Sequence, residues 1–227
     1  MPIVTVRDLK RTYQQGQLEV HALRGVDLDI EAGEFTALMG PSGSGKTTLL
    51  NQIGALDTPS SGSVLVDGRE LAGMTKAQLS ALRLNRLGFV FQAYNLIPVL
   101  TAYENTEFVL MMRGMPQAER RERVMRTLAA VGLEGMEHRR PAELSGGQQQ
   151  RVAVARAIVG EPALVLADEP TANLDSKTGN DLIALMRRLN AEQGITFVFA
   201  THDPKVMEAA TRVVDMVDGE VSSDTRK

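Results

Sequence analysis

A glycine-rich loop at residues 40–47 carries the clearest chemistry in the chain. It reads Gly-Pro-Ser-Gly-Ser-Gly-Lys-Thr and matches G-x-x-x-x-G-K-[ST] at every fixed position. Glycines let a backbone wrap around phosphate oxygens and point its N–H groups inward. We expect Lys46 to reach the β- and γ-phosphates of a nucleotide and the Thr47 hydroxyl to bind Mg²⁺. The nucleotide contacts predicted for this loop are Gly40, Pro41, Ser42, Gly43, Ser44, Gly45, Lys46, Thr47 and Thr48.

Two adjacent carboxylates, Asp168 and Glu169, follow a run of apolar residues at 164–167. Open α/β sheets bind ligands beyond the carboxyl ends of their strands, where this pair is expected to lie. We expect Asp168 to hold Mg²⁺ through its water shell and Glu169 to act as general base on the attacking water. Alone, the pair could also be a solvated strand end, but together with the glycine-rich loop it predicts nucleotide hydrolysis.

A second phosphate-binding sequence lies about a hundred residues after the first. Residues 144–148 read Leu-Ser-Gly-Gly-Gln and open an expected helix. Ser145 is a favourable N-cap, and a helix start offers free N–H donors to an anion. Spacing alone leaves an ordinary helix cap as an open alternative. The nucleotide contacts predicted here are Ser145, Gly146, Gly147 and Gln148.

The order of these motifs resembles that of the ATP-binding subunits of ABC transporters, over essentially the whole chain. Leu-Ser-Gly-Gly-Gln upstream of Leu-Ala-Asp-Glu-Pro is very specific to that family. The resemblance implies that the signature of one subunit closes on the γ-phosphate held by the other. It therefore implies a head-to-tail, ATP-dependent homodimer around two ATP molecules, with Mg²⁺ as cofactor and integral membrane permease subunits as partners.

The resemblance extends to single residues outside these motifs. Tyr13 resembles the aromatic residue that stacks on adenine, and Gln92 resembles the glutamine that touches Mg²⁺ and the lytic water. His202 resembles the switch histidine that contacts the γ-phosphate and positions Glu169. Residues 173–175, Asn-Leu-Asp, resemble the loop that crosses the dimer interface. The predicted catalytic residues are Lys46, Glu169 and His202, and the predicted metal ligands are Thr47, Gln92 and Asp168.

Within the family, the chain looks most similar to the lipoprotein-releasing and macrolide-exporter branch. Residues 22–26, 54–59, 91–98 and 168–171 carry this likeness. Ala172 is one departure, because that branch usually has glycine there. The likeness implies a motor that transmits force to membrane partners with large periplasmic domains.

The expected elements place these motifs on an α/β fold. Val124, Leu128 and Val131 share one helical face within an expected helical insertion. Buried strands alternating with helices predict a P-loop NTPase core with a mainly parallel sheet, joined to an N-terminal antiparallel β-subdomain and an inserted α-helical subdomain. We expect one ATPase domain at residues 1–227, with its core at 1–92 and 160–221, helical subdomain at about 93–159 and polar tail at 222–227. The expected strands are 3–9, 20–30 (broken at Arg24-Gly25), 35–39, 62–68, 87–92, 163–168, 195–201 and 213–217, and the expected helices in the core are 46–55, 146–160, 176–192 and one from Pro204.

Composition narrows the choice of partners and compartment. The net charge is −3, from 25 basic and 28 acidic residues, so nothing in the total favours a nucleic-acid partner. The chain has no cysteine, which excludes a disulfide scaffold. No apolar run approaches the ~20 residues of a membrane span, and the start is unlike a signal peptide. We therefore expect a cytoplasmic protein, peripheral on the cytoplasmic face of the inner membrane.

Other functions remain open from sequence. A soluble ABC ATPase of DNA repair or translation is the main alternative, although such proteins typically carry coiled-coil insertions, zinc cysteines or two ATPase units. A P-loop kinase would leave residues 145–148 unexplained. For the permease, we expect docking on the insertion at residues 94–100, with simple packing of Leu96, Ile97 and Leu100 onto the core as the alternative.

Overall fold

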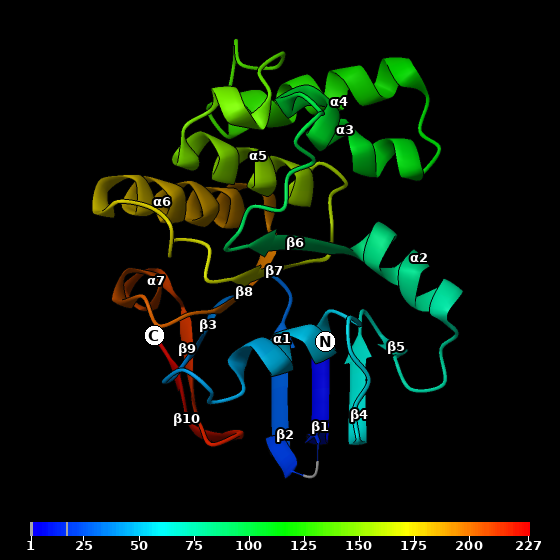
Figure 1. The fold of residues 1–227 in the computed structure, drawn as a ribbon, viewed down its shortest axis with the longest axis vertical. Helices are drawn as coiled ribbons and strands as arrows, with labels where there is room; N and C mark the ends of the chain where they lie inside the picture. Colours follow the sequence, from blue (N-terminus) through cyan, green and yellow to red (C-terminus); the bar gives the residue numbers. More distant parts are fainter. Residues whose placement is uncertain (1, 17) are drawn as a thin grey trace.

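Two sheets organise the computed structural model, which describes residues 2–16 and 18–227 (Figure 1). An antiparallel sheet has the order β2-β1-β4-β5, and a six-stranded sheet has the order β10-β9-β3-β8-β7-β6. In the larger sheet β9, β3, β8, β7 and β6 are parallel, and only β10 is antiparallel. The strands are β1 Pro2–Gln15, β2 Leu18–Glu31, β3 Phe35–Met39, β4 Ser61–Val66, β5 Arg69–Glu70, β6 Leu87–Phe91, β7 Leu164–Asp168, β8 Thr196–Ala200, β9 Arg212–Val217 and β10 Glu220–Arg226.

Seven α-helices of the described residues cover both faces of the larger sheet and form a separate layer beyond it (Figure 1). The first, α1, lies between the two sheets, since it contacts β2 and β4 as well as β7 and β8. On the other face α5 packs on β6 and α6, and it carries α3 and α4 outside it. The helices are α1 Lys46–Ile53, α2 Lys76–Arg86, α3 Ala102–Met112, α4 Gln117–Ala130, α5 Gly146–Ile158, α6 Ser176–Gln193 and α7 Pro204–Ala209, with a short 3₁₀ turn at Pro141–Glu143.

The buried strands explain why two hydrophobic cores form. Side chains alternate between the faces of a strand, so a parallel strand covered on both sides must be apolar throughout. In β8, Phe197 and Phe199 enter the core beneath α5 and α6, whereas Val198 and Ala200 enter the core shared with α1 and the antiparallel sheet. All four are fully buried. The predicted α/β core is therefore confirmed.

The helical insertion also matches its prediction. Val124, Leu128 and Val131 are fully buried on one side of α4 and its end. Thr101 and Glu104 form a reciprocal capping box that starts α3. Figure 1 shows α3, α4 and α5 gathered at one end of the molecule, away from the antiparallel sheet. A helical insert is thus present, as the fold prediction required, while its expected bounds of about 93–159 remain a prediction.

Two local differences from the sequence expectation have clear causes. The strand expected to break at Arg24-Gly25 continues through, because Gly25 is an extra residue between the pairs Leu9–Val26 and Lys10–Arg24. The extra residue forms a β-bulge rather than a turn, and the φ of 116° at this position is one that glycine adopts easily. Helix α2 was not predicted: only Leu82 of its residues is buried, and its start is marked by a capping box of Thr75 and Gln78 rather than by a long apolar stripe.

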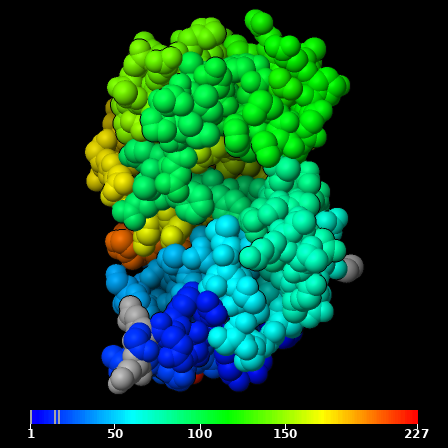
Figure 2. Space-filling view, turned by 45° about the vertical axis from the view of Figure 1, so that its right-hand side comes forward, coloured from blue at the N-terminus to red at the C-terminus, as the bar shows by residue number. Residues whose placement is uncertain are grey.

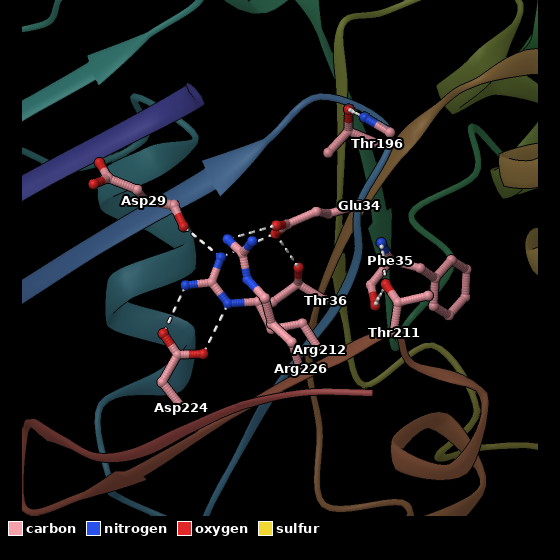
Figure 3. A network of polar contacts seen from close by, with 10 residues as sticks. Asp29, Glu34, Phe35, Thr36, Thr196, Thr211, Arg212, Asp224 and Arg226 are labelled. Carbon is pink, nitrogen blue, oxygen red and sulfur yellow. Dashed lines mark hydrogen bonds and ion pairs between the residues drawn. The ribbon is translucent and has the colours of Figure 1, made fainter. Parts of the chain in front are cut away.

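The expectation of a polar tail at residues 222–227 needs a correction, because residues 222–226 belong to the edge strand β10. Arg212 holds it there. This side chain is only 5% exposed, and it donates to both carboxylate oxygens of Asp224 at 2.8 and 2.7 Å and to Glu34 at 3.0 Å. Figure 3 shows the guanidinium of Arg212 between these two acids. Polar side chains are common on edge strands, so polarity misled the sequence-based expectation.

We expect Asp224→Asn to release β10. The hydrogen bonds from Arg212 lower the pKa of Asp224 below its usual range, so the folded state favours the charged carboxylate. Its contribution is therefore complete above the ordinary value of about 3.9 and disappears as the pH falls through the lower folded pKa. Hydrogen exchange should show protection of β10 that is lost at acid pH in the parent chain and is weak at neutral pH in the variant. Asp181→Asn, on the exposed side of α6, is the control, and equal β10 protection in both variants would contradict the assignment.

Candidate active site

Four neighbouring parallel strands bring the candidate residues to one edge of the larger sheet. In the sheet order β3-β8-β7-β6, each strand ends in a predicted site segment. The glycine-rich loop follows β3, and His202 lies two residues beyond β8. Asp168 ends β7 with Glu169 directly after it, and Gln92 follows β6. Adjacent parallel strands thus gather residues from distant parts of the sequence at the position where α/β sheets bind ligands.

The loop after β3 has a shape that only glycine permits at two positions. Gly40 has a φ of 140°, and a Cβ there would lie 2.2 Å from the carbonyl oxygen of Met216. Gly45 has a φ of 99° and caps α1, and a Cβ there would lie 2.6 Å from the carbonyl oxygen of Ala22. Close packing against β9 and β2 therefore fixes the loop, which leads into the N-terminus of α1.

Inside the loop, the polar groups fit an anion. The Lys46 side chain is buried, and its Nζ donates to the carbonyl oxygens of Gly40 at 2.8 Å and Pro41 at 2.9 Å. The Ser44 hydroxyl is buried without a hydrogen-bond partner in the described part of the chain. A buried ammonium facing neutral acceptors and an orphaned hydroxyl are both satisfied by phosphate oxygens. Ser42, Gly43 and Thr47 lie exposed around them, and Thr48 is half-buried.

Thr47 and Asp168, predicted as metal ligands, lie together. The Thr47 hydroxyl donates to Oδ1 of Asp168 at 3.0 Å. The pKa of Asp168 is raised. Burial is the largest cause and the neighbouring Glu169 adds to it, while the hydrogen bond from Thr47 and the charge of Lys46 oppose the rise. The Gln92 side chain is exposed at the end of the adjacent strand. Hydroxyl, carboxylate and amide oxygens are the donors that Mg²⁺ prefers, so these residues fit that ion.

Glu169 is held at both carboxylate oxygens. The Thr201 hydroxyl donates to Oε2 at 2.9 Å, and Nδ1 of His202 lies 2.7 Å from Oε1. The φ of Glu169 is 44°, an unusual value for this residue type, and its N–H donates to the carbonyl of Ala200. The Glu169 side chain is 19% exposed and the His202 side chain 73%. A fixed carboxylate at the rim, with an imidazole open to solvent beside it, is suited to accept a proton from water.

Sequence reasoning assigned no role to Thr201 or to the side chain of Asn173. Thr201 is fully buried as the first polar residue after β8, and this position beside His202 is the signal that could have identified it. Asn173 donates from Nδ2 to the carbonyl of Gln92 at 2.9 Å. Asp175 caps α6 by accepting from two backbone N–H groups. The loop at residues 173–175 therefore ties the end of β6 to the start of α6, a contact that no local pattern reveals.

The Leu-Ser-Gly-Gly-Gln sequence at residues 144–148, predicted to bind phosphate, forms the predicted helix cap. Ser145 accepts from the N–H of Gln148 at 3.3 Å, and Gln148 accepts from the N–H of Ser145 at 2.9 Å. Ser145 is exposed. A Cβ on Gly147 would lie 2.3 Å from Cγ2 of Thr178, so α5 packs tightly on α6 here. The cap belongs to the layer on the opposite side of the core sheet from α1 (Figure 1). Within one chain, the two sequences predicted to bind phosphate therefore belong to layers on opposite faces of the core sheet.

Tyr13 lies in β1, whose partner strand β2 packs against the loop at Gly45. Its hydroxyl donates to Oδ2 of Asp57 at 2.7 Å, and the guanidinium carbon of Arg11 lies 4.3 Å from the ring centroid. Arg11 in turn forms an ion pair with Asp57 at 2.8 Å. The ring is thus fixed in position with one face covered by a cation.

Comparison with known proteins identifies the family that this fold and site define. The ABC transporter family model matches residues 23–172. The macrolide export ATP-binding/permease protein MacB of Brucella melitensis is 46% identical over the full length of this chain, which spans only 35% of that protein. An uncharacterized ABC transporter ATP-binding protein of Thermotoga maritima is 44% identical, with 99% of this chain and 96% of that protein aligned.

Solved structures show the same fold. A dimeric structure of the ATP-binding cassette MJ0796, in a post-hydrolysis state bound to ADP and phosphate, matches with a TM-score of 0.90 and 44% identity over 98% of both chains. A cbiO1 cassette from Clostridium perfringens matches with a TM-score of 0.89 and 32% identity over 99% of this chain and 88% of that one. The chain belongs to the ABC transporter family, as an ABC-type ATPase cassette. None of its described helices is long and apolar enough to span a bilayer.

Proposed function

We propose that this chain is the ATP-hydrolysing motor of an ABC transporter that acts through lipoprotein release or macrolide-type efflux. The observation that carries the proposal is the divided nucleotide site. The loop around Lys46 supplies an ammonium, a hydroxyl and backbone amides that can bind a triphosphate. Ser145, in contrast, is exposed and caps α5, which lies in another layer. A head-to-tail homodimer brings the cap of one chain over the loop of its partner, which gives both sequences a use.

Each site residue has a role in this proposal. Lys46, Ser44 and the loop amides bind the phosphates, and adenine stacks on the face of the Tyr13 ring opposite Arg11. Thr47, Asp168 and Gln92 would hold Mg²⁺, which neutralises charge on the phosphate oxygens when it is bound.

Hydrolysis then depends on an oriented general base. Glu169 takes the proton from the attacking water, while Thr201 and His202 hold its two oxygens. Gly146, Gly147 and Gln148 shape the helix start that contacts the γ-phosphate from the partner chain. Opening of the dimer after hydrolysis supplies the motion that the membrane partners use.

The partner that fits is a membrane permease, docked in a groove between the helical subdomain and the core. This groove has a volume of about 390 Å³ and is bordered by α2, β6, α3 and α5. Of the expected docking segment at residues 94–100, only Asn95 lines the groove, and Leu96 packs against the core instead. We therefore move the proposed docking surface to the groove itself. The proposal places the chain on the cytoplasmic face of the inner membrane, without a nucleic-acid partner.

A disulfide test addresses the dimer directly, because the natural chain has no cysteine. Ser42→Cys and Ser145→Cys are made in separate chains, each with Glu169→Gln to slow hydrolysis, and the two are mixed. We expect an interchain disulfide on a non-reducing gel only when ATP is present. Ser42→Cys mixed with Ser222→Cys, an exposed position on β10, is the matched control. Crosslinking that ignores ATP, or equals the control, would reject the divided site. Gly147 variants are avoided because they would clash with Thr178.

A further inference from the structure

The groove bordered by α2, β6, α3 and α5 combines an apolar wall with three guanidinium groups. Figure 2 shows the hollow between the green surface of the helical subdomain and the teal surface of α2. Arg83, Arg113 and Arg156 line it, each half-buried and each from a different helix or helix end. The apolar part of the wall includes Leu56, Leu84, Leu87, Phe89, Phe91 and Val109.

In the described part of the chain, these three arginines have hydrogen-bond partners but no carboxylate within ion-pair distance. Arg83 donates to the carbonyl of Ala55 at 2.7 Å, and Arg113 donates to the carbonyl of Leu84 at 2.9 and 2.7 Å. Arg156 donates to the carbonyl of Tyr94 at 2.8 Å. Arg83 also donates to the Ser80 hydroxyl at 2.9 Å, and Glu161 acts on Arg113 only from farther away. Across residues 2–16 and 18–227, none of the three makes an ion pair with a carboxylate.

Elsewhere this chain pairs comparable arginines with acids. Arg11 lies 2.8 Å from Asp57, Arg86 lies 2.6 Å from Asp67, and Arg120 lies 2.8 Å from Glu107. Among the described residues, the groove is thus a place where several half-buried guanidinium groups gather without a carboxylate in direct contact. A guanidinium stays charged in proteins, and a carboxylate is its best-matched partner.

Burial strengthens the attraction between these guanidinium groups and any carboxylate that reaches the groove. Burial lowers the pKa of Arg156. It is also the first cause that lowers the pKa of Arg113, followed by repulsion from Arg123 and Arg86, while attraction from Glu161 opposes these effects. A cation that has lost water beside apolar side chains gains more from an arriving carboxylate than an exposed cation does. The apolar wall in turn favours aliphatic neighbours of that carboxylate.

Resting on the proposed docking of a permease in this groove, we propose that the docked segment is amphipathic and carries carboxylates that face Arg83, Arg113 and Arg156. Its apolar side chains cover Leu56, Phe89 and Val109. Arg156 also connects this contact to the active site. It belongs to the helix capped by Ser145, and it holds the carbonyls of Tyr94 and Asn95, which follow Gln92. Charge complementarity thus selects the partner segment. Because Arg156 contacts the backbone just after Gln92, binding of that segment is structurally linked to the nucleotide site.

Two synthetic amphipathic peptides of equal length test the proposal. They share leucines on one face and differ only in two glutamates that are glutamines in the second peptide. Binding to the full chain is measured by fluorescence anisotropy at low and high salt. We expect the glutamate peptide to bind on the order of tenfold more tightly at low salt, with the difference shrinking as salt screens the charges. Arg83→Gln should remove most of this preference, and Arg83→Lys should keep most of it.

A second pair of variants separates the charge from the groove. Leu56 is 48% exposed on the groove wall, and Leu18 is 72% exposed in the distant β1–β2 hairpin. Leu56→Lys should weaken binding of both peptides, whereas Leu18→Lys should change neither. Unchanged ATP affinity shows that each variant is folded. Equal binding of the two peptides, still sensitive to Leu56→Lys, would overturn the acidic partner and leave the docking groove standing. No binding, or binding indifferent to Leu56→Lys, would overturn both.

Discussion

Glu169→Gln should slow ATP hydrolysis by a factor on the order of 10²–10⁴ and leave ATP binding intact. The amide has nearly the shape of the carboxylate and keeps an oxygen that can accept from Thr201. It cannot take a proton from water, so only the chemical step is lost. Phosphate release under steady-state conditions measures the rate, and a calorimetric titration measures nucleotide affinity. Because ATP then persists, the variant should also elute as an ATP-dependent dimer in gel filtration.

The chain offers a matched control for this change. Glu161 is another glutamate with a positive φ, at 51°, and it lies outside the candidate site. Glu161→Gln should therefore keep the parent rate of hydrolysis. Thr201→Val keeps the shape of Thr201 but removes its bond to Glu169, so its rate should fall between those of the parent and Glu169→Gln. Near-normal turnover by Glu169→Gln would show that a different group activates the water.

Local motifs explain why so much of the candidate site could be predicted. The conformation of the glycine-rich loop depends on glycines at fixed spacing, and the cap at Ser145 depends on Gln148 three residues later. Such contacts lie within one short stretch of sequence and are readable there. The buried stripe of Leu182, Met186 and Leu189 on α6 is equally local, and all three are at most 1% exposed.

Contacts between distant residues explain what the sequence did not predict. The edge strand β10 depends on Arg212, which reaches Asp224, Glu34 and the carbonyl of Asp29. The hold on Glu169 depends on Thr201, 32 residues away. No periodicity or motif encodes these pairs, because each is set by which strands become neighbours in the sheet.

The groove shows the same limit for a binding surface. Arg83, Arg113 and Arg156 are far apart in the sequence, and each looks like an ordinary helical arginine. Only the packing of α2, α3 and α5 around β6 brings them to one hollow. Sequence reasoning predicted docking on the apolar residues after Gln92. In the structure Leu96, one of these residues, is partly buried and packs against the hydrophobic core.

Lys46→Ala should abolish tight binding of Mg-ATP. The Lys46 ammonium is the only cation among residues 40–48, and removing it leaves the carbonyls of Gly40 and Pro41 facing the phosphates. Hydrogen bonds to charged groups contribute about 1.5–3 kcal/mol each. The loss of two hydrogen bonds from Lys46 to phosphate oxygens would lower the affinity for ATP by a factor on the order of 10² or more. Calorimetric titration with ATP in the presence of Mg²⁺ measures this directly.

Lys76→Ala is the control for that experiment, because Lys76 is likewise the first residue of a helix, α2, but lies exposed outside the site. It should bind ATP as the parent chain does. Lys46→Ala should also stay folded, since the ammonium donates hydrogen bonds only to neutral carbonyls. Asp168, which also feels the charge of Lys46, keeps its hydrogen bond from Thr47. If Lys46→Ala bound ATP as tightly as Lys76→Ala, the phosphates could not lie in this loop. The orphaned Ser44 hydroxyl would then need another ligand, and the proposed catalytic role of Glu169 would lose its substrate.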